Sequence, residues 1–278
     1  MDTIINYTTN NDGYRSNGRL KVKGIMLHST ATPGIMAKAF RDRFNKPGLG
    51  KSVHGFLDDV CYVQCLPYDK KAGHCRYAGN DTHIGIELCE PMAWQTDHEY
   101  FDKVYENALQ LVTGLCVQFG LDETNVIDHA EGHTLGIASN HSDVGHWFPL
   151  FGKNMDLFRA DVARRLAGRR ADIRMLQQAL NHDFGEDLQV DGVVGPKTLA
   201  AAAKHLLRYK RGGKYMTGKY VLWVQQRLLE KGYDIGGTGA DGKYGKHTAD
   251  AVRRLQTAAS IAKDGIVGKD TLQALVNA

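Results

Sequence analysis

The sequence lacks the features that would hold the chain in a membrane or send it through a secretory pathway. No apolar run reaches the roughly 18 residues that a membrane-spanning helix needs, so we expect no such helix in the 278 residues. The opening residues, MDTIINYTTNNDGYRSNG, have neither a basic start nor an apolar stretch, and a secretory signal requires both. These absences favour a protein made in the cytoplasm.

Cysteine is also scarce, and its placement excludes a disulfide framework. The count of five is odd, and no two cysteines form a CxxC pair. None lies beside a base in a motif, so we expect no catalytic thiol. We expect reduced thiols at Cys61, Cys65, Cys75, Cys89 and Cys116.

The rest of the composition is that of a globular protein, with 42% hydrophobic and 24% charged residues. The formal net charge of +4 is unevenly spread, because residues 1–168 carry −3 and residues 169–278 carry +7. Histidine is concentrated in the first part, mainly between His28 and His146. This asymmetry predicts two domains, 1–168 and 169–278, with the chemistry in the first and an acidic partner for the second.

The first domain is expected to be α/β. Short apolar runs bounded by turn residues predict buried strands at residues 23–27, 84–88 and 126–127. Two further runs, 53–58 and 61–66, bracket an Asp-Asp pair and predict a hairpin.

Two helices are predicted beside these strands. Apolar residues recur at helical spacing from Phe101 to Phe119 and stop at Gly120, which is typical of a helix end. A second helix is predicted from about Met155 to Ala167, ending at Gly168. Strands mixed with helices indicate a mixed central sheet flanked by helices.

The second domain is expected to be small and all-α, because it repeats one pattern. The octet Asp-Gly-x-x-Gly-x-x-Thr occurs at residues 191–198, 241–248 and 264–271. Its first glycine permits a positive φ after the aspartate, and its second suits a helix N-cap. Each octet therefore predicts a tight turn into a helix, and helices bearing glutamine separate the octets.

This succession of helix, octet, helix, octet and helix resembles the peptidoglycan-binding modules of bacterial and phage cell-wall hydrolases. Residues 215–278 match a full repeat. Residues 171–214 match a partial repeat, in which the basic stretch RYKRGGK at 208–214 replaces the second octet. The resemblance implies that residues 169–278 bind the cell wall, and the octets favour recognition in grooves between helices.

Polar residues follow the predicted strands of the first domain, where α/β folds tend to place their sites. His28 follows one apolar run, His129 follows another, and Asp143 lies in a polar loop. Two histidines and a carboxylate, with a fourth position left to water, are the ligand set of a catalytic zinc. Spacing alone leaves surface histidines as an alternative, and His133 and His146 compete for the ligand roles.

Four motifs in order make residues 20–167 resemble the zinc N-acetylmuramoyl-L-alanine amidases related to peptidoglycan recognition proteins, the type 2 amidases. These motifs are LHST at 27–30, IGIE at 84–87, HAEG at 129–132 and DVG at 143–145. Carried over position by position, the resemblance implies zinc ligands at His28, His129 and Asp143. It also implies catalytic roles for Glu87 and His141.

In the mechanism that the resemblance implies, Glu87 carries a proton from water to the leaving amine. His141, which stands where many members have a lysine, donates a hydrogen bond to the oxyanion. Val144 replaces the family's usual proline, which is a second departure. His74 and Asn80 resemble positions that line the substrate cleft, and they are predicted to bind substrate.

The two resemblances together imply a cell-wall lytic amidase that cleaves between N-acetylmuramic acid and L-alanine of peptidoglycan. A lytic enzyme without a secretory signal is expected to be a phage or prophage endolysin that leaves the cell through a holin and acts on a Gram-positive wall. Two alternatives remain open, a recognition protein that binds peptidoglycan without catalysis and a cytosolic amidase that recycles muropeptides. No nucleic-acid partner is expected, because the basic half lacks the known aromatic and basic interleaving.

Overall fold

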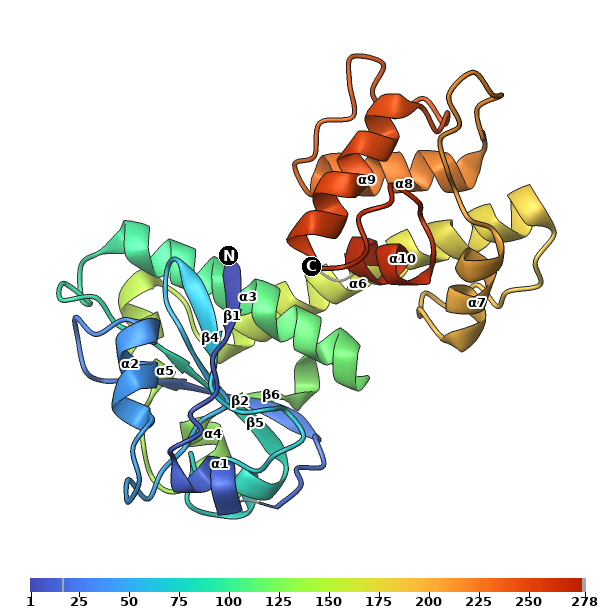
Figure 1. The fold of residues 1–278 in the computed structure, drawn as a ribbon. Coiled ribbons are helices and arrows are strands. Elements are labelled where there is room, and N and C mark those ends of the chain that lie inside the picture. Colours follow the sequence, from blue (N-terminus) through green and yellow to red (C-terminus); the bar gives the residue numbers. More distant parts are fainter. Residues whose placement is uncertain (17, 277–278) are drawn as a thin grey trace. The chain divides into compact units, whose positions relative to one another are not determined.

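The computed structural model describes residues 1–16 and 18–276, and it divides into two units (Figure 1). The N-terminal unit is Met1–Leu166 and the C-terminal unit is Ala167–Ala278. Each unit has a hydrophobic core of its own. Among the described residues, no helix is both long enough and apolar enough to cross a membrane.

The N-terminal unit is built on a mixed sheet, as the sequence predicts, and the described strands lie in the order β1-β4-β3-β5-β2-β6. The β3–β4 pair is the predicted hairpin and is antiparallel, whereas the other four pairs are parallel. The three neighbouring strands β5, β2 and β6 are parallel, so their carboxyl ends meet at the same edge of the sheet. The strands are β1 (Asp2–Ile5), β2 (Gly24–Ser29), β3 (Gly55–Leu57), β4 (Cys61–Gln64), β5 (His83–Leu88) and β6 (Val126–Asp128).

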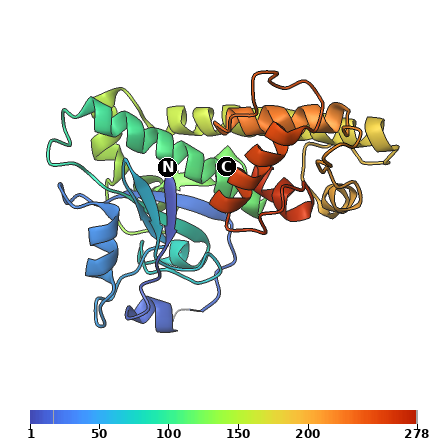
Figure 2. The same ribbon diagram turned by 45° about the horizontal axis from the view of Figure 1, so that its top comes forward.

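The alternation of side chains along β2 separates two faces of the sheet. Ile25 and Leu27 pack into the main core with helices α3 (His98–Phe119) and α6 (Met155–Phe184). Figure 2 shows these helices along one side of the sheet. Met26 and His28 take the alternate positions, and Met26 packs in a separate small cluster with Cys75. The polar side chain of His28 therefore lies on the face of the sheet opposite α3 and α6.

Helix α3 confirms the helix predicted from Phe101 to Phe119 and begins slightly earlier. Asp97 caps its start by accepting a hydrogen bond from the backbone N–H of Tyr100. Gly120 ends it in the left-handed conformation, with φ of 66°. Both ends of this helix are therefore explained by residues that the sequence already displays.

The other helices that lie wholly within the N-terminal unit are short, and the sequence analysis did not predict them. Helix α2 begins after Met36 with no side-chain cap, so no start signal marks it in the sequence. These helices are α1 (Asp12–Ser16), α2 (Ala37–Phe44), α4 (His129–Thr134) and α5 (Val144–Trp147). Single turns of 3₁₀ helix lie at Ala78–Asp81, Glu123–Asn125 and Phe148–Phe151.

The prediction that the helix starting at Met155 ends at Gly168 is wrong. Helix α6 continues through Gly168 and ends at Phe184. One glycine within a helix costs only about 1 kcal/mol relative to alanine. The surrounding alanine and arginine residues are good helix formers, so the helix continues.

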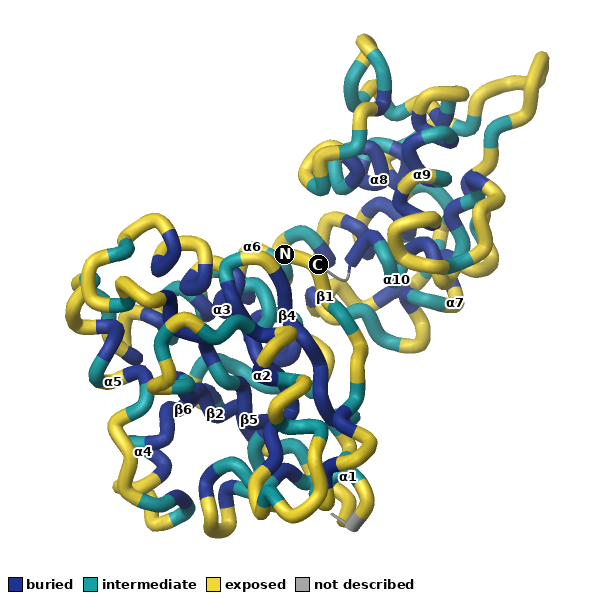
Figure 3. The backbone as a smooth tube through the Cα atoms, turned by 60° about the vertical axis from the view of Figure 1, so that its left-hand side comes forward, coloured by how far each residue is buried: buried dark blue, intermediate teal, exposed yellow. Residues whose placement is uncertain are grey.

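The C-terminal unit is all-α, as predicted, and each octet forms the turn that leads into one of its helices. The first glycine of each octet has a positive φ: 78° at Gly192, 70° at Gly242 and 73° at Gly265. A helix begins directly after the second glycine in each case. Figure 3 shows the buried faces of these helices turned toward a shared core. The helices are the second part of α6, α7 (Pro196–Lys204), α8 (Lys219–Glu230), α9 (Lys246–Ala258) and α10 (Lys269–Val276).

A buried glutamine side chain holds the second octet in place. Gln225 Nε2 donates to Asp241 Oδ1 at 2.9 Å and to the Lys243 carbonyl at 3.1 Å. The Thr248 hydroxyl lies 3.1 Å from the same nitrogen. Gln225 Oε1 accepts from the Gly242 N–H at 2.7 Å. One side chain therefore provides hydrogen-bond partners for both backbone and side-chain groups of the turn.

The same network recurs around Gln177 in the first octet and Gln256 in the third. The aspartate, glycine and threonine of each octet are thus committed to internal hydrogen bonds. The octets explain how the unit folds. Because these polar groups form hydrogen bonds within the turn, they do not face a ligand.

We expect Gln225→Met to lower the free energy of unfolding of the C-terminal unit by about 2–4 kcal/mol, because it leaves buried donors and acceptors without partners. Methionine has a similar size and keeps the apolar contacts. Urea denaturation monitored by Trp223 fluorescence measures the change. Gln226→Met is the matched control, since Gln226 lies next in the same helix but outside the network. An equal loss in both variants would contradict a special role for the network.

Candidate metal centre and active site

His28 and Glu87 are neighbours across two parallel strands. His28 of β2 and Glu87 of β5 are Cα partners in the strand register, so their side chains lie on the same face of the sheet. This is the face opposite α3 and α6. The strand pattern therefore places an imidazole and a carboxylate side by side near the ends of their strands.

His129 and Asp143 reach the same place from segments that follow β6. Asp128 caps helix α4 in a capping box with Glu131, and this cap fixes the position of His129 at the first helical residue. Asp143 precedes α5 with φ of 38° and ψ of −122°, a strained conformation for a residue with a side chain. Such strain costs of order 1–3 kcal/mol and persists where the surroundings enforce it, often at functional sites.

The three side chains converge on one point. The nitrogens His28 Nδ1 and His129 Nδ1 lie 3.0 Å and 2.6 Å from Asp143 Oδ2, and 3.0 Å from each other. Burial raises the pKa of Asp143, but its interactions with His129 and His28 outweigh the effect of burial, so the net pKa is well below its usual range. Two ring nitrogens this close compete for the same carboxylate oxygen, an arrangement that a shared cation relieves.

A chain of hydrogen bonds fixes which nitrogen of His28 faces Asp143. The His83 carbonyl can only accept, so His74 Nε2, at 3.2 Å, must donate to it. Burial lowers the pKa of His74 well below its usual value, so its ring is neutral and its Nδ1 is an acceptor. His28 Nε2, at 2.8 Å from that Nδ1, therefore donates. In neutral His28, the lone pair is then on Nδ1, the atom that faces Asp143.

Glu87 carries an oxygen with no partner. Its Oε2 is buried and has no hydrogen bond among the described residues. Burial raises the pKa of Glu87 above its usual value, while the positive charge of His28 and, more weakly, that of Lys51 act to lower it. A buried polar atom without a partner costs free energy, so its retention points to a substrate, a water or an ion.

The other predicted residues lie around this centre with different contacts. The ring of His141 is exposed and lies 5.0 Å from the ring of His129. His133 Nδ1 lies 3.3 Å from the Ala138 carbonyl, and His146 pairs with the buried Glu90 at 3.1 Å. The structure thus groups His129 with the other candidate ligands and turns both competing histidines toward other partners.

His74 and Asn80 make contacts of their own. Asn80 Oδ1 accepts hydrogen bonds from the backbone N–H groups of His74 and Cys75, both at 2.9 Å, and so holds this turn together. His74 contacts His28. Binding of substrate by His74 and Asn80 stays a prediction.

His54 is fully buried, and both of its ring nitrogens are hydrogen-bonded. Its Nε2 donates to the Lys70 carbonyl and its Nδ1 accepts from the Gly85 N–H. Burial lowers the pKa of His54 to about 4, which keeps the ring neutral. These contacts are those of a core histidine.

Two residues at the site escaped the sequence reasoning. The Ser139 hydroxyl lies 3.2 Å from His129 Nε2 and orients that ring from behind. Lys51 lies close enough to Glu87 to act on its pKa. Ser139 lies beside the Asn140–Asp143 segment, but nothing in its spacing marks it as a partner of His129. Lys51 lies in a glycine-rich loop with no motif.

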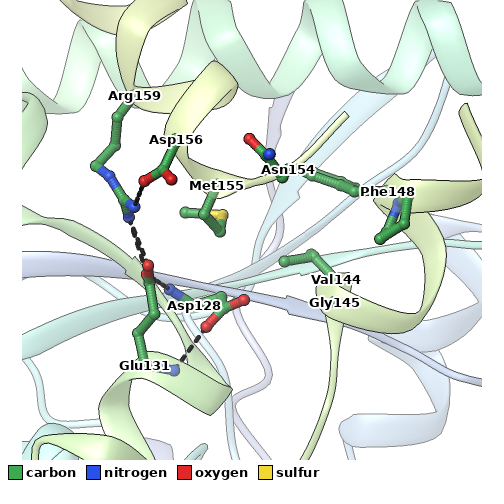
Figure 4. Close-up of a pocket in the computed structure, with 10 residues that line it drawn as sticks. Asp128, Glu131, Val144, Gly145, Phe148, Asn154, Met155, Asp156 and Arg159 are labelled. Carbon is green, nitrogen blue, oxygen red and sulfur yellow. Dashed lines mark hydrogen bonds and ion pairs between the residues drawn. The ribbon is translucent and has the colours of Figure 1, made fainter. Parts of the chain in front are cut away.

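A cavity of about 260 Å³ is lined by residues near the starts of α4, α5 and α6, and not by His28, Glu87, His129 or Asp143. Asp128 and Val144, which line it, adjoin the candidate ligands in sequence. Figure 4 shows Arg159 bridging Asp156 and Glu131, and Glu131 in turn bonded to Asp128. The charged groups of this cavity are paired with one another. They brace the start of α4 and thereby the position of His129.

The donor set fits a divalent metal ion. His28, His129 and Asp143 each offer one ligand atom, and these atoms lie within 4.8 Å of one another. Two imidazole nitrogens and a carboxylate oxygen suit zinc, and three protein ligands leave a position for water. The partners of the second ring nitrogens, His74 and Ser139, are the kind of support that metal-binding histidines have.

Known protein families match both units. Residues 18–146 match the family described as N-acetylmuramoyl-L-alanine amidase. Residues 217–275 match a peptidoglycan binding domain family, and residues 171–222 match one described as a predicted peptidoglycan domain.

Similar proteins occur in Bacillus. The chain is 28% identical over 274 residues to the "Probable N-acetylmuramoyl-L-alanine amidase" of Bacillus licheniformis, covering 91% of this chain and 66% of that protein. It is 27% identical over 263 residues to N-acetylmuramoyl-L-alanine amidase XlyA of Bacillus subtilis strain 168, covering 84% of each. The solved catalytic domain of XlyA aligns with a TM-score of 0.49 and 23% identity, covering 58% of this chain and 99% of that one. The chain spans about two thirds of the length of the first relative.

Proposed function

Because residues 18–146 match the N-acetylmuramoyl-L-alanine amidase family and the residues after them match peptidoglycan-binding domains, we propose that the chain is a cell-wall lytic amidase. It hydrolyses the amide bond between the lactyl group of N-acetylmuramic acid and L-alanine. The observation that supports this most is the convergence of His28, His129 and Asp143 on the face that carries Glu87. The site thus combines a set of metal ligands with a carboxylate that has a free oxygen.

We propose zinc as the metal, held by His28 Nδ1, His129 Nδ1 and the Asp143 carboxylate. A zinc ion in such a site polarises a carbonyl and lowers the pKa of bound water to about 7. The hydrogen bonds through His74 and Ser139 keep both rings oriented for this role. Metal binding also requires neutral histidines and an ionised carboxylate, so a metal ion competes with protons for His28 and His129.

Glu87 moves the proton in this mechanism. As a carboxylate it accepts a proton from the attacking water, and as an acid it delivers that proton to the departing amine of L-alanine. Burial raises its pKa toward the working pH, which suits a group that must both accept and release a proton. His141, exposed beside His129, donates a hydrogen bond to the oxyanion that develops on the former carbonyl.

One digestion separates this proposal from its alternatives. Purified cell walls are treated with the protein, and new N-terminal alanine and new reducing sugar are both measured. The amidase releases alanine amino groups and no reducing sugar. Walls that bind the protein and release neither product would favour a recognition protein. Activity on soluble muropeptides alone, with intact walls resistant, would favour a recycling amidase.

The C-terminal unit is proposed to hold the enzyme on its polymer. Tethering raises the effective concentration of the enzyme at the wall without a new contact at the active site. A Gram-positive wall of the kind that Bacillus builds is the proposed target, since the curated relatives come from that genus. Release from the host cell through a holin stays a prediction from the sequence.

We expect His74→Leu to weaken zinc binding by about 10–100-fold, the usual effect of losing the partner of a ligating histidine. Leucine cannot accept the His28 Nε2–H hydrogen bond, so the ring loses its fixed tautomer and orientation. Competition with a chromogenic chelator measures the affinity. His74→Asn retains an acceptor oxygen near the position of Nδ1 and is expected to recover part of the loss. Equal affinity in wild type and His74→Leu would refute the role of His74.

A further inference from the structure

The segment between α7 and α8 of the C-terminal unit differs from every other connection in that unit. It contains the basic loop, which we define as residues 208–214 with the sequence RYKRGGK. Figure 1 shows the chain between α7 and α8 as a long excursion, and the basic residues of the loop are exposed. The loop stands where a full repeat would have its second octet.

Both ends of the basic loop are fixed to the unit. Before it, Leu207 and Val267 exchange two backbone hydrogen bonds at 3.2 and 2.9 Å. After it, the Met216 carbonyl accepts from the Tyr244 N–H at 2.8 Å. At its tip, the Gly213 N–H donates to the Lys210 carbonyl at 3.0 Å and closes a tight turn. The loop is therefore displayed from a fixed base.

The basic side chains of the loop have no acidic partner. Among the described residues, Arg208, Lys210, Arg211 and Lys214 are all exposed and form no ion pair. From residue 192 to residue 229 the sequence contains eight lysines and arginines and no aspartate or glutamate. Like charges this close repel one another, and no ion pair among the described residues relieves the repulsion.

Apart from Tyr209, which packs against the core of the unit, the loop contributes little to the fold. Each octet has a buried glutamine that binds its aspartate, glycine and threonine, and the basic loop has no equivalent network. Four cations in seven residues destabilise a compact state through their repulsion. A segment that replaces a structural turn with unpaired charge is better explained by a binding role than by a structural one.

We propose that the basic loop binds an anionic phosphodiester polymer attached to the cell wall. The inference rests on the proposed function of the C-terminal unit as the part that meets the wall. A phosphodiester polymer carries a negative charge at every repeat and imposes no single binding geometry. Several cations displayed on a Gly-Gly turn can bind such a polymer without a shaped pocket. Arginine and lysine both bind phosphate oxygens, arginine with two parallel donors and lysine as a point charge.

Sedimentation with walls tests the proposal, using the full chain in a Glu87→Gln background so that the walls stay intact. The variant Arg208→Gln, Lys210→Gln, Arg211→Gln and Lys214→Gln is compared with its parent on walls before and after removal of phosphodiester polymers by hydrofluoric acid. We expect the variant to bind untreated walls at least about tenfold more weakly at low salt, since exposed ion pairs are individually weak but add up. On treated walls, the parent and the variant should bind equally.

The matched control removes the same number of positive charges elsewhere in the unit. Its substitutions, all at exposed positions, are Arg170→Gln, Arg174→Gln, Lys197→Gln and Lys263→Gln. It should bind untreated walls within about twofold of the parent. The advantage of the parent over the loop variant should shrink as the Debye length falls below about 8 Å.

Several outcomes would overturn the proposal. A loop variant that binds untreated walls as tightly as the parent would show that the loop binds nothing there. A parent that keeps its full advantage on treated walls would assign the loop to carboxylates of peptidoglycan instead. If the parent fails to bind walls at all, the wall-binding function of the whole unit fails with it. Separate measurement of amide hydrolysis by the chain with native Glu87 shows whether the enzymatic proposal stands.

Discussion

The variant Glu87→Gln is expected to lose wall hydrolysis by roughly 10²–10⁴-fold, the usual scale for a general acid–base group. Glutamine has nearly the same shape as glutamate but cannot accept and release a proton. Glu87 is not among the grouped metal ligands, so zinc content should stay at the wild-type level. The melting temperature should not fall, because the change removes a buried charge that lacks a hydrogen-bond partner on Oε2. Release of N-terminal alanine and metal analysis measure the two effects.

Glu131→Gln is the matched control for this prediction. Glu131 lies on α4, the helix that begins with the candidate ligand His129, but its side chain caps that helix and contacts Arg159. Glutamine also serves at this position of a capping box. We expect a loss of activity far smaller than that of Glu87→Gln. Wild-type turnover by Glu87→Gln would remove Glu87 from the mechanism, whatever the control does.

The grouping of His28 with Glu87 was expected from the motifs that resemble the amidases, and strand geometry accounts for it in the structure. Each residue lies near the end of a short apolar run, and alternation along two adjacent parallel strands puts both side chains on one face. His129 follows a third such run, and Asp128 before it is a recognisable helix cap. Local pattern and the order of motifs therefore sufficed to predict which of these side chains lie together, and their roles stay predictions.

The support behind the site could not be anticipated. His74 contacts His28 across 46 residues of sequence, and the atom that sets its tautomer is the backbone carbonyl of His83. A backbone carbonyl has no side-chain signature. The edge strand β1, four residues long and largely exposed, likewise has too little pattern to be recognised. These features depend on tertiary placement, which no local rule supplies.

The prediction for helix α6 failed for a different reason, because one local signal, Gly168, was given too much weight. Gly168 is a good helix stop only where the chain can turn away after it, in the left-handed conformation. Here the residues around it favour helix, and the chain continues to Phe184. The octet glycines Gly192, Gly242 and Gly265 were interpreted correctly because each one sits in a complete turn motif, whereas Gly168 stands alone.

The variant His129→Ala is expected to lose both its zinc and its activity. Alanine removes one of the three grouped ligand atoms and leaves His28 and Asp143, which are too few to hold the ion tightly. Metal analysis after dialysis should fall from about one zinc per wild-type chain to nearly none. His133→Ala is the matched control, because His133 lies one turn later on the same helix and its Nδ1 lies near the Ala138 carbonyl. It should keep both zinc and activity.

Thermal unfolding provides a second measure of this prediction that does not depend on catalysis. A ligand present at about 1,000 times its Kd stabilises the native state by about 4 kcal/mol, so a chelator should lower the melting temperature of wild type and of His133→Ala. It should leave His129→Ala unchanged, since that variant has no metal to lose. Added zinc should restore the melting temperature of the first two only. Undiminished zinc in His129→Ala, or a chelator shift equal to that of wild type, would mean that His129 is not a ligand and that the metal lies elsewhere.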